Sequence, residues 1–134
     1  MKKFIFLLLI TVTFVSCALN DEPSRDFVVL PVESVIMPDS YTAGTVSEII
    51  IKYRRPTQCH IFDGFYFDVN GSERTIAIQA VKLNQNNCTD DTESLYEIPF
   101  DFRPTVSGEY TMKFWLGTDE SGIDQYLVHE IIVQ

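Results

Sequence analysis

The chain has 134 residues, 46% of them hydrophobic, and its 10 basic and 19 acidic side chains give a formal net charge of −9. This length and composition fit one domain that is large enough to bury a core. The acidic balance argues against nucleic acid as a partner, because the protein surface and the phosphate backbone repel each other.

Residues 1–16 have the order of an export signal. Lys2 and Lys3 precede an uncharged apolar run that ends at Ser16, directly before Cys17. A basic start, an apolar middle and a small residue at the cleavage site are typical of a secretory signal peptide. The run is shorter than the roughly 20 residues that a spanning helix needs. Removal of residues 1–16 would leave 8 basic and 19 acidic residues, a net charge of −11.

The cysteine after this signal resembles the lipobox cysteine of bacterial lipoproteins. In that family the thiol receives diacylglycerol and the signal is cut in front of it, which implies lipidation of Cys17 and a membrane anchor. Each buried acyl CH₂ contributes about 0.8 kcal/mol, so two or three chains anchor a protein stably. The leucine usual three positions upstream is Phe14 here. The alternative is an ordinary secretory signal with an unmodified Cys17.

The segment that follows, residues 17–26, is short and polar and contains Pro23, so we expect a flexible tether. Its acidic stretch, residues 20–22, is similar to clusters associated with surface export in some Gram-negative bacteria. A solvated linker explains the same residues. We expect an outer-membrane lipoprotein that faces either the periplasm or the cell surface.

Residues 27–134 are expected to form one domain. Aromatic and β-branched residues alternate with polar ones between turn signals, which predicts strands. Pro31 indicates an edge strand, Asn70-Gly71 a tight hairpin, and a slip in the alternation near Ala80 a bulge or bend. Seven strands favour a two-sheet sandwich. The expected strands are residues 27–37, 48–54, 62–69, 74–83, 96–103, 109–116 and 125–133.

Two further cysteines, Cys59 and Cys88, lie within this domain. An even pair in an exported protein predicts a disulfide, which would close a loop of about 30 residues and contribute roughly 3–4 kcal/mol. Two free thiols are the alternative. His60 and His129 lie in no catalytic motif, and without a CxxC pair a zinc site is disfavoured.

The stretch Phe102-Arg103-Pro104 followed by Ser107-Gly108-Glu109-Tyr110 resembles the E-to-F corner of immunoglobulin-like domains. A tyrosine near the start of strand F hydrogen-bonds to the corner backbone there, and the resemblance implies this role for Tyr110. Met112 stands where an antibody-type domain has its second cysteine. The chain is more similar to small, uncharacterised immunoglobulin-like lipoproteins of Gram-negative bacteria. That resemblance implies an immunoglobulin-like sandwich of about seven antiparallel strands in the cell envelope and transfers no site residues.

A candidate binding surface comes from two aromatic residues. Tyr66 and Trp115 point away from the apolar faces of their strands, and both would lie on one outer surface with Lys113 if the strands expected at 62–69 and 109–116 are neighbours. Flat aromatic faces of this kind can hold sugar rings. The alternative is a Trp115 packed under a loop or at the rim of the sandwich.

The acidic loops at 90–93 and 119–124 offer oxygen ligands for calcium, but neither has the EF-hand order, and solvated hairpin tips are the alternative. The adjacent Arg54 and Arg55 suit either carboxylate recognition or solubility. We therefore expect no enzyme, no cofactor and no metal site. The expected function is a lipid-anchored interaction or scaffold domain that binds another envelope protein; the alternative is a carbohydrate-binding surface lipoprotein.

Overall fold

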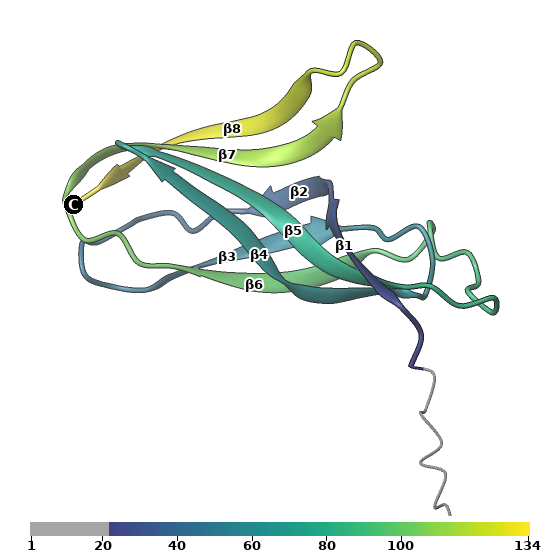
Figure 1. The fold of residues 1–134 in the computed structure, drawn as a ribbon. Helices are drawn as coiled ribbons and strands as arrows, with labels where there is room; N and C mark the ends of the chain where they lie inside the picture. Colours follow the sequence, from purple (N-terminus) through teal and green to yellow (C-terminus); the bar gives the residue numbers. More distant parts are fainter. Residues whose placement is uncertain (1–21) are drawn as a thin grey trace, which may run out of the picture.

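The computed structural model describes residues 22–134, and these form eight strands in two facing sheets with no helix (Figure 1). Within residues 22–134 there is thus no helix that is long and apolar enough to cross a membrane. One sheet has three antiparallel strands in the order β2-β3-β6: Val32–Ile36, Ser47–Tyr53 and Tyr96–Phe102. The other is five-stranded and mixed, with β1 (Arg25–Leu30), β4 (His60–Asn70), β5 (Glu73–Leu83), β7 (Gly108–Thr118) and β8 (Asp124–Val133).

The first expected strand is two strands, because the chain changes sheet at Pro31. β1 pairs with β5 and β2 pairs with β3, and proline cannot donate the hydrogen bond that would continue a ladder. This explains eight strands rather than seven. β1 also begins at Arg25, inside the expected tether, where the side-chain amide of Asn84 donates to Asp26 Oδ2 at 2.9 Å.

β4 and β5 form the expected hairpin, with two differences in detail. Its two-residue loop is Gly71-Ser72, one position later than the Asn-Gly pair, and Gly71 has the positive φ of 60° that the turn requires. A bulge lies at the level of Ala80, but the register shift is in β4 between Phe62 and Gly64. The slip in the alternation of β5 therefore reflects an extra residue in its partner strand.

The opposite edge of β5 has two partners in succession. β7 runs parallel to it from Glu73 to Ile76, and β1 pairs antiparallel with it from Ile78 onward. The expectation of wholly antiparallel sheets is therefore wrong. The strands at 62–69 and 109–116, whose pairing was the condition for a shared outer surface, are not neighbours, because β5 lies between β4 and β7. Figure 1 shows the tip of the β7–β8 hairpin diverging from β5.

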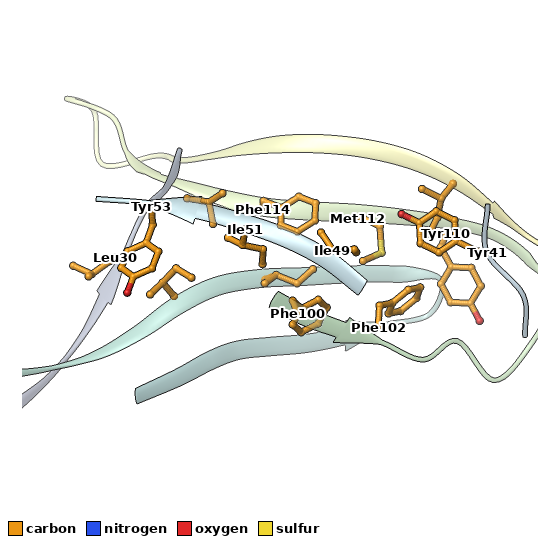
Figure 2. Close-up of a cluster of buried hydrophobic side chains, with 14 of the residues drawn as sticks. Leu30, Tyr41, Ile49, Ile51, Tyr53, Phe100, Phe102, Tyr110, Met112 and Phe114 are labelled. Carbon is orange, nitrogen blue, oxygen red and sulfur yellow. The ribbon is translucent and has the colours of Figure 1, made fainter. Parts of the chain in front are cut away.

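The core lies between the sheets. Figure 2 shows Ile49 and Ile51 of β3 facing Met112 and Phe114 of β7, and all four side chains are fully buried. Burying one such side chain contributes about 1.5–3 kcal/mol. The alternation of β7 is as expected up to Phe114, whereas Leu116 is exposed beside the diverging hairpin tip.

The corner before β7 has the geometry of a tyrosine corner. The Tyr110 hydroxyl donates a hydrogen bond to the carbonyl of Val106 at 2.8 Å, and the Tyr110 side chain is buried. Its ring also packs edge-on against Phe102. The corner thereby links the end of β6 to the start of β7, and hence one sheet to the other.

Candidate functional site

A hollow of about 380 Å³ lies on the outer face of the five-stranded sheet. All five strands of that sheet contribute to its lining, which combines three aromatic rings with charged side chains at the edges. We call it the aromatic hollow; its lining residues are Val29, Tyr66, Asp68, Glu73, Thr75, Ala77, Lys113, Trp115, Asp124 and Tyr126.

The hollow forms where β5 changes partner. Ala77 lies between the last residue paired with β7, Ile76, and the first paired with β1, Ile78. Its small side chain is only 3% exposed, because larger side chains that also line the hollow surround it. Tyr66 is its cross-strand partner on β4. A small residue at the point where two strands separate therefore leaves space that larger side chains enclose.

One wall is a cross-strand pair on the β7–β8 hairpin, Trp115 opposite Tyr126. The Trp115 indole N–H donates to Asp124 Oδ1 at 3.0 Å, and the Thr118 hydroxyl donates to the same oxygen at 2.9 Å. These two hydrogen bonds lower the pKa of Asp124, the bond from Trp115 contributing most. The carboxylate is therefore charged at neutral pH, and it fixes the orientation of the indole.

The cation of the hollow is held in place by two contacts. Lys113 Nζ lies 4.4 Å from the centre of the Tyr126 ring and 3.2 Å from Glu73 Oε1. Its charge is therefore largely balanced within the protein. Tyr66 on the opposite wall is 45% exposed, so much of its ring is accessible to a ligand.

The structure thus brings Tyr66, Trp115 and Lys113 together on one outer surface, although β5 separates the two strands whose pairing was the condition for it. Trp115 lies in the wall of the hollow. Sequence reasoning missed Tyr126, whose outward position in the alternation of its strand was the available signal. Ala77 carried no signal, because its role depends on which strands flank β5.

Comparisons with known proteins do not assign the chain to a family. No family model, curated protein or solved structure matches this chain. The site is therefore interpreted from its geometry alone.

A second cluster of polar side chains surrounds the expected disulfide, which is present: Cys59 and Cys88 are bonded, with their Cα atoms 5.4 Å apart. Arg55 Nε donates to Asp91 Oδ2 at 2.5 Å, and the Tyr96 hydroxyl donates to the same oxygen at 2.6 Å. The Arg55 guanidinium also lies over the Tyr96 ring, 4.4 Å from its centre. We call these five residues the disulfide end.

The carboxylate of the disulfide end, Asp91, accepts several hydrogen bonds. Hydrogen bonds from the side chains of Ser94, then Tyr96 and Arg55, lower its pKa from 3.8 to about 2. Its side chain is buried, and each of its partners belongs to the same domain. The arrangement closes the 84–95 loop onto the sandwich and presents no unpartnered charge to a ligand.

The other candidate residues also have internal partners. Arg54 donates hydrogen bonds to both oxygens of the Glu33 carboxylate, a partner within the chain. His60 is buried with Nδ1 2.9 Å from the Thr57 hydroxyl, and His129 packs edge-on against Phe114.

In the acidic loops, Asp90 accepts hydrogen bonds from Thr92, and Asp119 accepts them from the amides of Ser121 and Ile123. Among residues 22–134, no three His, Cys, Asp or Glu side chains are grouped as metal ligands would be. Cys17 lies outside the residues that the structure describes.

Proposed function

We propose that the protein is an exported, lipid-anchored, non-catalytic domain that binds a carbohydrate in the aromatic hollow. The observation that carries this proposal is the grouping of Tyr66, Trp115 and Tyr126 around a shallow space edged by carboxylates. Binding sites are commonly concave and apolar, with a few fixed polar groups that orient the ligand.

Sugars match this combination of surfaces. The C–H faces of a pyranose ring are apolar and pack on aromatic rings, while its hydroxyl groups donate hydrogen bonds to carboxylate oxygens. Trp115 is preorganised by its bond to Asp124, and Lys113 is held between Tyr126 and Glu73. A ligand therefore meets side chains that are already oriented, which lowers the entropy cost of binding.

A glycan array followed by titration calorimetry tests the proposal. Trp115→Ala should weaken binding roughly 30-fold, because truncation of a central aromatic anchor costs about 2 kcal/mol. Ile132→Ala is the matched control: Ile132 lies on the outer face of β8, is 68% exposed and does not line the hollow. Equal affinities for the Trp115→Ala variant and the control would contradict the proposal.

The lipid anchor and the envelope location are supported by the signal-like residues 1–16 and by Cys17. The disulfide between Cys59 and Cys88 agrees with an oxidising compartment. Cells grown with a labelled fatty acid should incorporate the label into the wild-type protein and not into Cys17→Ser. A wild-type chain that carries no acyl group would rule out the anchor.

We further propose that the domain is a variant of the immunoglobulin-like sandwich. The Tyr110 corner and the sheet change at Pro31 support this relationship. The parallel pair of β5 and β7 departs from the usual arrangement, in which both sheets are antiparallel. The proposed variant therefore differs from the usual immunoglobulin-like sandwich in the position of the β4–β5 hairpin, whose strand β5 lies beside β7.

The second candidate is an interaction domain for another envelope protein. From Asp124 to Ile131, β8 has no strand paired on its free edge among residues 22–134. Val128 on that strand is 48% exposed, so the edge could accept an added strand. In-cell cross-linking through β8 should then trap one protein, and Val128→Lys should abolish the cross-link.

A further inference from the structure

We infer that the ligand is a linear, uncharged oligosaccharide that extends from Trp115 past Val29 to Phe27. This inference rests on the proposed function and specifies its ligand. Its starting point is Phe27, which at 80% is the most exposed large hydrophobic side chain of the described residues. No sequence expectation assigned this residue a role.

Phe27 lies on the same face of the sheet as the aromatic hollow. It pairs with Val81 of β5, which pairs on its other side with Ile61 of β4. Ile61 is 46% exposed, so an apolar row crosses three strands at this level. An exposed aromatic ring on such a row provides a second platform for a sugar ring.

The two platforms lie in adjoining hollows. A second hollow, of about 230 Å³, is lined by Phe27, Val28, Val29, Asp63 and Gln79, and Val29 also lines the aromatic hollow. Gly64 on β4, the cross-strand partner of Gln79, has no side chain that could stand between the two hollows. The two hollows therefore adjoin at Val29, and we treat them as one track along the outer face.

The length of the track sets the minimum length of the ligand. Val81 is level with Phe27, and Ala77 forms the floor of the aromatic hollow. The four residue steps between Val81 and Ala77 span about 13 Å along a strand. A disaccharide seated on Trp115 therefore does not reach Phe27, whereas a trisaccharide or a longer chain does.

Charge along the track selects against acidic glycans. Asp63, Asp68, Glu73 and Asp124 line the two hollows, and Lys113, their one cationic lining residue, is paired with Glu73. The carboxylates repel uronic acids, sulfates and phosphates but accept hydrogen bonds from hydroxyl groups. Of neutral and acidic glycans, the track therefore favours a neutral sugar chain.

The test is the chain-length dependence of affinity. Wild type, Phe27→Ala and the Ile132→Ala control are titrated with β-1,4-linked glucans, mannans and xylans from disaccharide to hexasaccharide. In one of these series, wild-type affinity should rise with length. Phe27→Ala should lose about tenfold for the hexasaccharide and less than about twofold for the disaccharide. Because Phe27 is so exposed, the thermal unfolding midpoint of Phe27→Ala should stay at the wild-type value.

Three results would overturn the inference, and they separate it from the proposed function. If Phe27→Ala binds the hexasaccharide like wild type while Trp115→Ala does not bind it, the hollow is a sugar site without the extension. If Phe27→Ala weakens all lengths equally, the two platforms are not separate subsites. If the wild type binds none of these series, the inference fails, and the proposed function fails with it unless the glycan array shows another sugar, anionic ones included, bound in the hollow.

Discussion

The disulfide end and the aromatic hollow are built from similar residues and differ in what their side chains contact. At the disulfide end, Arg55, Asp91 and Tyr96 contact one another, and Asp91 is 9% exposed. At the hollow, Trp115 is fixed by an acid, but across from it Tyr66 remains 45% exposed. Polar groups that satisfy each other stabilise the fold, whereas the partly exposed Trp115 and the exposed Tyr66 leave ring surface that a ligand can contact.

The largest expected effect is on stability, at the disulfide end. Replacing both Cys59 and Cys88 by serine removes a crosslink between residues 29 positions apart. The unfolding free energy in denaturant should fall by roughly 3–4 kcal/mol, because the unfolded chain gains loop entropy. Sugar affinity at temperatures where the variant stays folded should not change. A loss of binding in the folded variant would show that the two regions are coupled.

The converse variant fills the hollow and leaves the disulfide end intact. Ala77→Leu places a larger side chain on the floor between Tyr66 and Trp115. Affinity measured by calorimetry should fall at least about tenfold, because the added side chain occupies the space between the two rings. Because Ala77 is only 3% exposed, the larger side chain must displace its neighbours in part, and the unfolding free energy should fall by about 1–3 kcal/mol. Undiminished binding would contradict the assignment of the floor.

Tyr110→Phe tests a third position, on the same strand as Trp115 but on its inner face. The variant removes the hydroxyl that donates to the Val106 carbonyl, and we expect a loss of about 1 kcal/mol in unfolding free energy. Sugar affinity should stay at the wild-type value. A variant as stable as wild type would mean that the corner bond makes no net contribution.

A further expected effect is a change in the pH dependence of stability. The pKa of Asp91 in the folded state is about 2, below its ordinary value of 3.8. Asp91 therefore stabilises the fold above pH 3.8, and this contribution is lost as pH falls from 3.8 through about 2. Thermal unfolding midpoints of Asp91→Asn should fall less steeply over this interval than those of wild type. Parallel curves for the two proteins would contradict the role of the carboxylate.

Local alternation predicted which side chains of β7 face inward and which face outward. Tyr110, Met112 and Phe114 are buried, and Lys113 and Trp115 line the outer hollow, because successive residues of a strand point to opposite faces. The pairing of Cys59 with Cys88 was predictable for a different reason, because an even pair of cysteines is expected to form a disulfide if the chain is exported.

The order of the strands was not predictable in this way. The parallel pairing of β5 with β7 joins segments about 40 positions apart and leaves no periodic pattern in either strand. The change of partner at Ala77 follows from that pairing, and so does the hollow. Sequence reasoning therefore identified two aromatic residues of the candidate site but neither its floor nor Phe27.

The most direct test of the central claim, that the aromatic hollow is the ligand site, is an NMR titration of ¹⁵N-labelled protein with a neutral oligosaccharide. The indole N–H of Trp115, bonded to Asp124, reports on the wall of the hollow, and the backbone amide of Asp91 reports on the disulfide end. We predict that the Trp115 indole resonance shifts in a saturable manner while the Asp91 amide does not. A saturable shift at Asp91 or along β8 with an unchanged indole resonance would contradict the account.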